Sequence, residues 1–196
     1  DQGTTELADL RVVRDLRPAE YRSRSLSVAT QRPDDWLVEE TVGTITFTPD
    51  EVSSVKAQIG VIPLRRLGAA GRLSVEDILP ALLDILSEDV AASDIEPGES
   101  GPATLAGREA RRLDYTYTLV GRGRIAGSMV ALLDTAREQL IVSLSEAPVG
   151  ALEDETPALD MVRNNLTLLP TMFLNRMYSN QSLGFSLSYK DYWQVL

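Results

Sequence analysis

The chain has 196 residues and a formal net charge of −10, with 43% hydrophobic and 24% charged residues. This balance is typical of a globular protein and excludes a disordered tail, which combines low hydrophobicity with high charge. The sequence contains no cysteine and no histidine, which excludes disulfides, thiol nucleophiles, zinc-finger sites and a Ser-His-Asp triad. Acidic residues outnumber basic ones 29 to 19, so no nucleic-acid partner is expected.

The first half of the chain predicts several strands followed by a helix. Residues 1–19 are polar and are interpreted as a lead-in segment. Apolar residues that alternate with polar ones then predict strands over 26–30, 36–40, 44–48 and 55–64. Ser74 is a candidate helix cap, and an apolar stripe at helical spacing continues to Leu86 with Pro80 inside it.

The second half of the chain also predicts several strands followed by a helix. Residues 93–102 contain two prolines and two glycines and are predicted to form a loop. Strands are predicted over 109–120, 125–134 and 140–147, and a last helix with Thr156 as its cap and Pro157 as its first residue. The grouping favours an α+β fold, with a central antiparallel β-sheet flanked by helices. No run of about 18 apolar residues is present, so no transmembrane segment is expected.

An internal repeat is the strongest single signal. Tyr21–Val38 aligns without gaps on Tyr178–Val195 at a constant offset of 157, and six of the eighteen positions are identical. The chain has two tryptophans, Trp36 and Trp193, and they match. Tandem domains produce this self-similarity, so we predict these segments: a lead-in over 1–19, a domain over 20–169, a linker over 170–177, and the first strand and turn of a truncated second repeat over 178–196.

A family resemblance rests on the same two segments. Leu183–Trp193 resembles the opening motif of PsbP-like domains, in which a glycine and an aromatic residue lead into an alternating strand and a tryptophan. In the first copy Ser27 replaces the glycine and Val28 the aromatic residue, while Trp36 remains. Leu105–Ala110 resembles a further strand-opening motif of the family. The resemblance implies an α-β-α sandwich that is usually extracytoplasmic and serves as a binding or assembly factor, with no shared catalytic residues.

Two groups of residues are candidate binding residues. Arg108, Arg112, Arg122 and Arg124 fall on one predicted hairpin, where they form either a surface for an anionic partner or an ordinary solvated face. Tyr115 and Tyr117 share one face of an alternating strand, where they either pack in the core or line a pocket. Trp36 is interpreted as a core anchor.

The sequence predicts no catalytic, cofactor-binding or metal-binding residues, and solvated turns and helix ends account for its acidic pairs. The favoured function is a non-enzymatic, extracytoplasmic protein-binding or assembly module of the cell envelope. Such a module is either secreted or tethered to the membrane through a segment outside this sequence. A small-ligand carrier with a cleft between sheet and helix, near Tyr115 and Tyr117, is an alternative. A hydrolase with two carboxylates about 5–10 Å apart is another. The terminal repeat segment is also expected to support a homodimer, because a lone two-stranded piece is marginally stable and needs a surface to dock on.

Overall fold

The computed structural model describes residues 16–67, 74–89, 92–170, 176–180 and 185–189. Within these ranges the chain forms three antiparallel sheets and two α-helices. The elements, in chain order, are β1 (Pro18–Ser23), β2 (Val28–Pro33), β3 (Leu37–Thr41), β4 (Thr44–Thr48), β5 (Lys56–Pro63), α1 (Val75–Asp89), β6 (Ala92–Leu105), β7 (Arg108–Leu119), β8 (Gly123–Asp134), β9 (Gln139–Pro148), the 3₁₀ turn η2 (Val149–Ala151), α2 (Leu152–Asn164), β10 (Thr167–Leu168), β11 (Arg176–Asn180) and β12 (Phe185–Tyr189).

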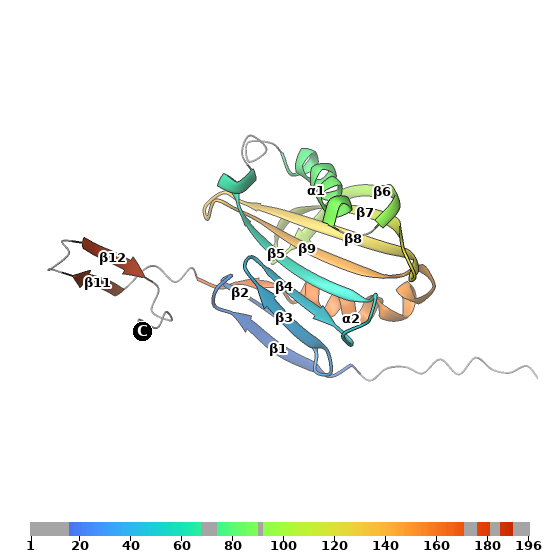
Figure 1. Cartoon of the computed structure of the whole chain (residues 1–196), viewed down its shortest axis with the longest axis horizontal. Coiled ribbons are helices and arrows are strands. Elements are labelled where there is room, and N and C mark those ends of the chain that lie inside the picture. The colour runs from blue at the N-terminus through green and yellow to red at the C-terminus, as the bar shows by residue number, and fades with distance from the viewer. Residues whose placement is uncertain (1–15, 68–73, 90–91, 171–175, 181–184, 190–196) are drawn as a thin grey trace, which may run out of the picture.

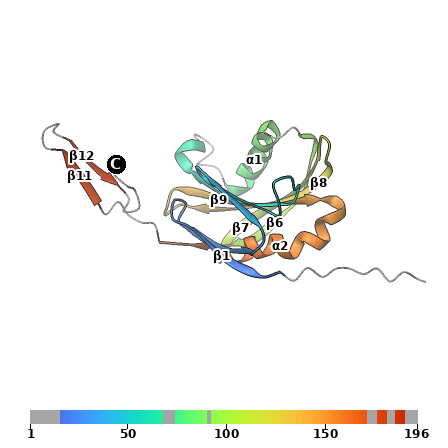
Figure 2. The same ribbon diagram turned by 60° about the horizontal axis from the view of Figure 1, so that its bottom comes forward.

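A seven-stranded sheet forms the centre of the molecule, with the strand order β3-β4-β5-β9-β8-β7-β6. All neighbouring strands in it are antiparallel. Helix α1 covers one face of the sheet and α2 covers the other (Figures 1 and 2). The predicted α+β fold, with a central antiparallel sheet flanked by helices, is therefore confirmed.

Strand alternation divides the core into two clusters, one on each face of the sheet. Along β8, Val130 and Leu132 belong to the cluster beneath α2, whereas Ile125 and Met129 belong to the cluster beneath α1. This division follows from the two-residue period of a strand, because successive side chains point to opposite faces. The helices complete the clusters with their own apolar stripes, listed here as Ile78, Leu79 and Leu83 from α1 and Ala158, Leu159 and Val162 from α2.

A smaller sheet with the order β1-β2-β10 packs beside α2. The hydroxyl of Thr30 in β2 donates a hydrogen bond to the carbonyl of Val162 in α2 at 2.5 Å. Trp36 follows β2 and is 2% exposed within the α2-side cluster. Its predicted role as a core anchor is confirmed, since a buried indole contributes a large apolar area. Trp193 lies outside the described residues.

The loop predicted over 93–102 is wrong, because these residues belong to β6, a 14-residue edge strand. The pairing with β7 shifts register between Ser93 and Glu96 and again between Pro97 and Ser100. An edge strand needs hydrogen bonds on one side alone, so it accepts prolines and bulges that a central strand excludes. The prolines and glycines that suggested a loop are therefore compatible with this place in the sheet.

The predicted starts of the first strand and the last helix also need correction. A strand, β1, precedes the first predicted one, and it begins at Pro18, inside the predicted lead-in. Helix α2 begins at Leu152, and the hydroxyl of Thr156 donates to the Leu152 carbonyl at 2.6 Å rather than capping the helix. Pro157 consequently lies inside the helix. Pro18 and its charged neighbours form an edge strand with little apolar alternation, which explains why the pattern did not reveal it.

Candidate functional site

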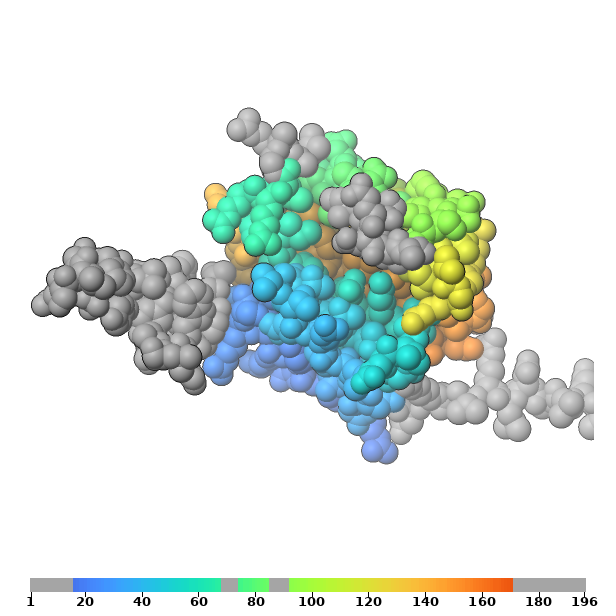
Figure 3. Space-filling model, in the orientation of Figure 1, coloured from blue at the N-terminus to red at the C-terminus, as the bar shows by residue number. Residues whose placement is uncertain are grey.

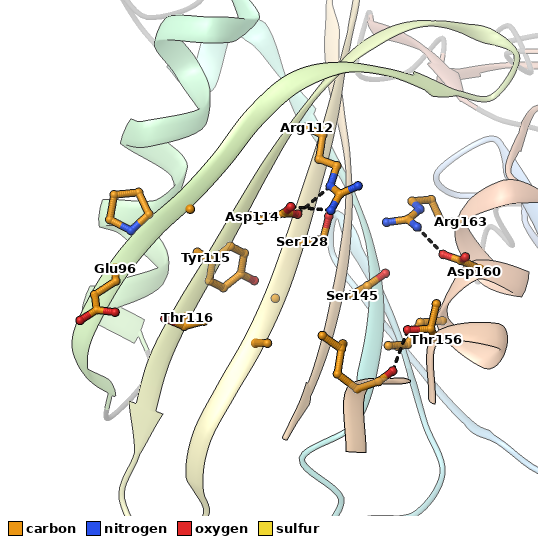
Figure 4. Close-up of a pocket in the computed structure, with 16 residues that line it drawn as sticks. Glu96, Arg112, Asp114, Tyr115, Thr116, Ser128, Ser145, Thr156, Asp160 and Arg163 are labelled. Atoms are coloured by element: carbon orange, nitrogen blue, oxygen red, sulfur yellow. Dashed lines mark hydrogen bonds and ion pairs between the residues drawn. The ribbon is translucent and has the colours of Figure 1, made fainter. Parts of the chain in front are cut away.

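A pocket of about 510 Å³ lies between the seven-stranded sheet and α2 (Figure 4). Strands β6 to β9 form its floor, and α2 forms one wall through Leu152, Thr156, Leu159 and two charged residues described below. The sequence predicted a cleft between sheet and helix near Tyr115 and Tyr117, and Tyr115 is one of the lining residues. We refer to this cavity as the helix–sheet pocket.

Three polar residues cross the floor of the helix–sheet pocket in one row. Asp114 on β7 is the register partner of Ser128 on β8, and Ser128 is the register partner of Ser145 on β9. Register partners in an antiparallel sheet point to the same face. The alternation of the three strands therefore places a carboxylate and two hydroxyls side by side beneath α2.

The two serine hydroxyls on this floor have unused hydrogen-bonding capacity. The Oγ atoms of Ser128 and Ser145 are buried, and neither has a hydrogen-bond partner within the described part of the chain. Ser145 as a whole is 6% exposed. Buried polar groups in proteins are nearly always paired, and an unpaired one costs about 1–3 kcal/mol. The floor is thus a polar surface whose hydrogen bonds the fold itself does not use.

Two arginine–aspartate pairs flank the floor, one from the sheet and one from α2. On β7, Nε of Arg112 donates to Oδ1 of Asp114 at 2.7 Å, and the Nη2 atom contacts the second carboxylate oxygen. On α2, Arg163 forms an ion pair with Asp160, one turn away (Figure 4). The hydrogen bond to Asp114, together with the negative charge of Asp114, Glu99 and Asp160, raises the pKa of Arg112 above its ordinary value. Each arginine is thus neutralised by the aspartate on its own element.

A buried carboxylate lies in the next cross-strand row, on the α1 side of the sheet. Glu146 on β9 is 0% exposed, and its two oxygens accept hydrogen bonds from the hydroxyls of Tyr115 (2.5 Å) and Tyr117 (3.1 Å). Lys56 on β5 adds an ion pair at 2.9 Å. A buried charge is tolerated when it is paired and fully hydrogen-bonded, so these contacts explain how the core accommodates Glu146.

Tyr115 and Tyr117 both pack in the core, and Tyr115 is also one of the residues that line the pocket. The rings of Tyr115 and Tyr117 stack with centroids 6.2 Å apart, and both side chains are buried. Burial and the nearby negative charge of Glu146 raise the pKa of both phenols well above the ordinary value. Core packing of the two rings is confirmed. Tyr115 also lines the pocket, together with Gly127, over which its ring lies.

The arginines predicted as one binding surface lie in different environments. Arg108, at the start of β7, forms a 3.0 Å ion pair with the buried carboxylate of Asp134, which is 2% exposed. Arg112 lies four residues further along β7 and lines the helix–sheet pocket. The structure therefore brings Arg112 and Tyr115 together at the pocket, whereas the ion pair of Arg108 joins the start of β7 to the end of β8.

The other two arginines lie at the opposite end of the hairpin. Arg122 lies in the β7–β8 turn and Arg124 is the second residue of β8; this end of the hairpin is exposed on the surface and appears yellow in Figure 3. Arg124 pairs with Glu96 on β6, and Arg122 donates to the carbonyl of Ser53 at 3.0 Å. Their role in binding stays a prediction.

Several residues of the site were not singled out from the sequence. Ser128, Ser145, Asp160 and Arg163 come together from β8, β9 and α2, and no local pattern links them. Glu146 did carry a signal, because it continues the buried positions Leu140, Val142 and Leu144 of the same strand. A carboxylate at the next position of such a series indicates a buried, paired charge.

Two further observations on the described residues concern metal binding and membrane-spanning helices. Within the described ranges, no three acidic side chains converge in a way that would hold a metal ion. None of the described helices is both long enough and apolar enough to cross a membrane.

Comparisons with known proteins identify the fold. No family profile matches the chain, and no curated protein matches its sequence. The solution structure of cyanobacterial PsbP from Synechocystis sp. PCC 6803 aligns with a TM-score of 0.57 at 15% identity, over 83% of this chain and 98% of that protein. The crystal structure of the Saccharomyces cerevisiae Ran-binding protein Mog1p aligns with a TM-score of 0.57 at 7% identity, over 80% and 97%. The chain therefore has the PsbP-like α+β fold that its sequence predicts.

Proposed function

We propose that the chain is a non-catalytic binding module, and that it carries a small polar ligand in the helix–sheet pocket. The observation that supports this most directly is the pair of buried, unpartnered hydroxyls of Ser128 and Ser145 on the floor of a 510 Å³ cavity. Ligand pockets are typically about 300–1,000 Å³ and contain a few polar groups that fix the ligand's orientation. A bound ligand would give these hydroxyls the hydrogen bonds that the fold leaves unmade.

The charges around the pocket indicate the class of ligand. Arg112 is paired with Asp114, and Arg163 with Asp160. Glu96, the remaining charged residue of the lining, is paired with Arg124, so the lining presents ion pairs rather than unpaired charge. Such a lining favours a neutral or zwitterionic molecule over a strongly charged one, because an unpaired ligand charge would remain uncompensated after desolvation. Leu152 and Leu159 offer apolar contact on the α2 side.

The same pairing supports a binding role over hydrolysis. Hydrolysis with two carboxylates requires one of them to be protonated as a general acid. Asp114 and Asp160 each form an ion pair with an arginine of the pocket, and Glu96, the third acid of the lining, pairs with Arg124. Each of the three acids in the pocket lining therefore lies against a cation, whereas a general acid is typically held in an apolar environment.

Protein binding at the cell envelope is the second candidate function. Its support is the shared fold with a protein named as Ran-binding, together with the PsbP-like resemblance, which implies an extracytoplasmic assembly factor. The partner is then a protein or an envelope component, and the exposed Arg122 and Arg124, at the β7–β8 turn and the start of β8, are the proposed contact. Charge reversal at Arg122 and Arg124 is expected to weaken capture of that partner from native envelope extracts, and unchanged capture would count against this role.

A thermal-shift screen tests the ligand-carrier proposal. The probes are amino acids, betaines and monosaccharides, and a ligand present at 100 times its Kd stabilises the native state by about 2.7 kcal/mol. For a protein of this size that raises Tm by roughly 5–10 °C. We expect Ser145→Ala to reduce the shift of any active probe. Ser143→Ala is the matched control, because Ser143 lies on the same strand with a buried, unpartnered hydroxyl and is not among the residues that line the pocket.

The two serine variants separate loss of binding from loss of stability. Each removes a buried hydroxyl without a partner among the described residues, so neither is expected to lower the Tm of the free protein. If no probe raises Tm, or if Ser143→Ala reduces the shift as much as Ser145→Ala, the pocket is not the ligand site.

A further inference from the structure

The terminal hairpin β11–β12 repeats the strand pairing of the hairpin β1–β2. In the first hairpin Tyr21 pairs with Thr30, and Ser23 pairs with Val28. In the terminal hairpin Tyr178 pairs with Leu187, and Asn180 pairs with Phe185. Each of these partners is 157 positions after its counterpart. The offset that aligns the two sequences therefore also aligns the two strand registers.

Agreement in register is a demanding test of the duplication. A slip of one residue would turn each side chain of a strand to the opposite face. A chance sequence match carries no requirement that two hairpins pair their residues in the same way. The register thus supports the repeat independently of the six identical residues.

The residues shared by the two segments have structural roles in the first one. Tyr21 packs edge-on against Phe47 with ring centroids 5.5 Å apart, and its hydroxyl donates to Glu40 at 2.5 Å. Leu26 packs against the α2-side core cluster, and Trp36 belongs to it. Four of the six identical residues thus belong to or pack against this cluster, Val38 being the fourth, whereas Ser25 and Asp34 are exposed.

A backbone requirement is matched as well. Ser27 adopts a left-handed conformation with a φ of 55°, which favours glycine because a Cβ atom is strained there. The position 157 residues later is Gly184. The second segment thus carries the residue type that the turn geometry of the first one favours.

We infer that β11–β12 is the counterpart of β1–β2 in a second unit of this fold, and that the edge of β12 left unpaired among the described residues binds a strand supplied by that unit. In the first domain β2 pairs on one edge with β1 and on the other with β10, through Ala29 and Val28. The equivalent positions of β12 are Ser186 and Phe185. The partner is therefore a short extended strand of the β10 kind.

A graft within this chain tests the equivalence. Replacing residues 18–33 by the sequence of residues 175–190 keeps the 157-residue offset and changes no loop length. We expect the graft to unfold cooperatively, and the amide of Leu169, which donates to the Ser27 carbonyl at 2.8 Å, to remain protected from hydrogen exchange. The matched control inserts residues 176–191 instead, which shifts the register by one residue and is expected to abolish both properties.

The graft places Phe185 where Val28 is 1% exposed, so overpacking alone could unfold it. A second version of the graft keeps valine at this position. A graft with the 157-residue offset that is no more stable than the shifted control, in both versions, would overturn the inference.

A cysteine cross-link tests the register in the intact chain, which has no cysteine of its own. Ser179 and Ser186 are register partners in the terminal hairpin, as Arg22 and Ala29 are in the first one. We expect the S179C/S186C pair to oxidise at least about tenfold faster than S179C/L187C, in which the second cysteine is one residue away from the register partner. The R22C/A29C pair provides the reference rate. Equal cross-linking of the in-register and shifted pairs would also overturn the inference.

Discussion

Gly127 lies beneath the ring of Tyr115, and the substitution Gly127→Ala tests how tightly this part of the sheet is packed. A Cβ atom built on Gly127 would lie 2.4 Å from Cζ and 2.7 Å from the hydroxyl oxygen of Tyr115. These distances are far shorter than any real contact, so the ring must move. Tyr115 is 1% exposed and packs in the α1-side core cluster, so the movement displaces other core side chains.

The cost has two parts that the structure allows us to estimate. Displacing the ring removes the hydrogen bond from Tyr115 to Glu146, and a bond to a charged group contributes about 1.5–3 kcal/mol. Overpacking a filled core costs a further ~1–3 kcal/mol. Alanine in a strand is ~0.5–1 kcal/mol more stable than glycine, which offsets part of this cost. We therefore expect the free energy of unfolding to fall by about 2–5 kcal/mol.

Urea denaturation followed by circular dichroism measures this change. The matched control is Gly101→Ala in β6, because a Cβ atom there meets no other atom within 4 Å. We expect the control to leave the free energy of unfolding unchanged or slightly increased. A Gly127→Ala variant within ~0.5 kcal/mol of the control, inside the range of neutral substitutions, would refute the packing of Tyr115 over Gly127.

Two further predictions concern backbone strain and pH. Ser27→Gly relieves the strain of the left-handed conformation at φ 55° and is expected to raise the free energy of unfolding by about 0.5–1 kcal/mol. A lower free energy of unfolding, measured by urea denaturation, would contradict this. Burial and Glu146 raise the pKa of Tyr117 in the native state, so the unfolded state loses this proton first and stability falls as pH rises above ~10. Urea denaturation between pH 8 and 12 should show a shallower fall in Tyr117→Phe, and equal slopes would disprove the assignment.

Much of the fold could be predicted because strand alternation is a local property. The period of two along β7 placed Leu113, Tyr115 and Tyr117 on one face, and all three are buried there. The prolines of β6 misled the prediction, since their tolerance depends on the strand lying at the edge of the sheet. Strand order is a property of the whole topology, and no local window contains it.

The site was harder to predict than the fold, for the same reason. Ser128 and Ser145 are polar residues on strands that otherwise carry core side chains, yet only the cross-strand register brings them together. Arg163 looks like an ordinary basic residue in the last turn of a helix, where its positive charge interacts favourably with the helix dipole. Its place in the pocket depends on how α2 crosses the sheet.

Tyr115 and Gly127 connect the two faces of the sheet. The side chain of Tyr115 belongs to the α1-side core and donates to Glu146, while Tyr115 and Gly127 are both among the residues that line the helix–sheet pocket. A change that displaces the ring therefore alters the pocket lining as well as the buried carboxylate. Because Ser145 precedes Glu146 on β9, the hydroxyl on the pocket floor and the buried charge are held by one strand. Ligand affinity in the pocket is thus expected to depend on the α1-side hydrogen bonds, although no residue of α1 lines it.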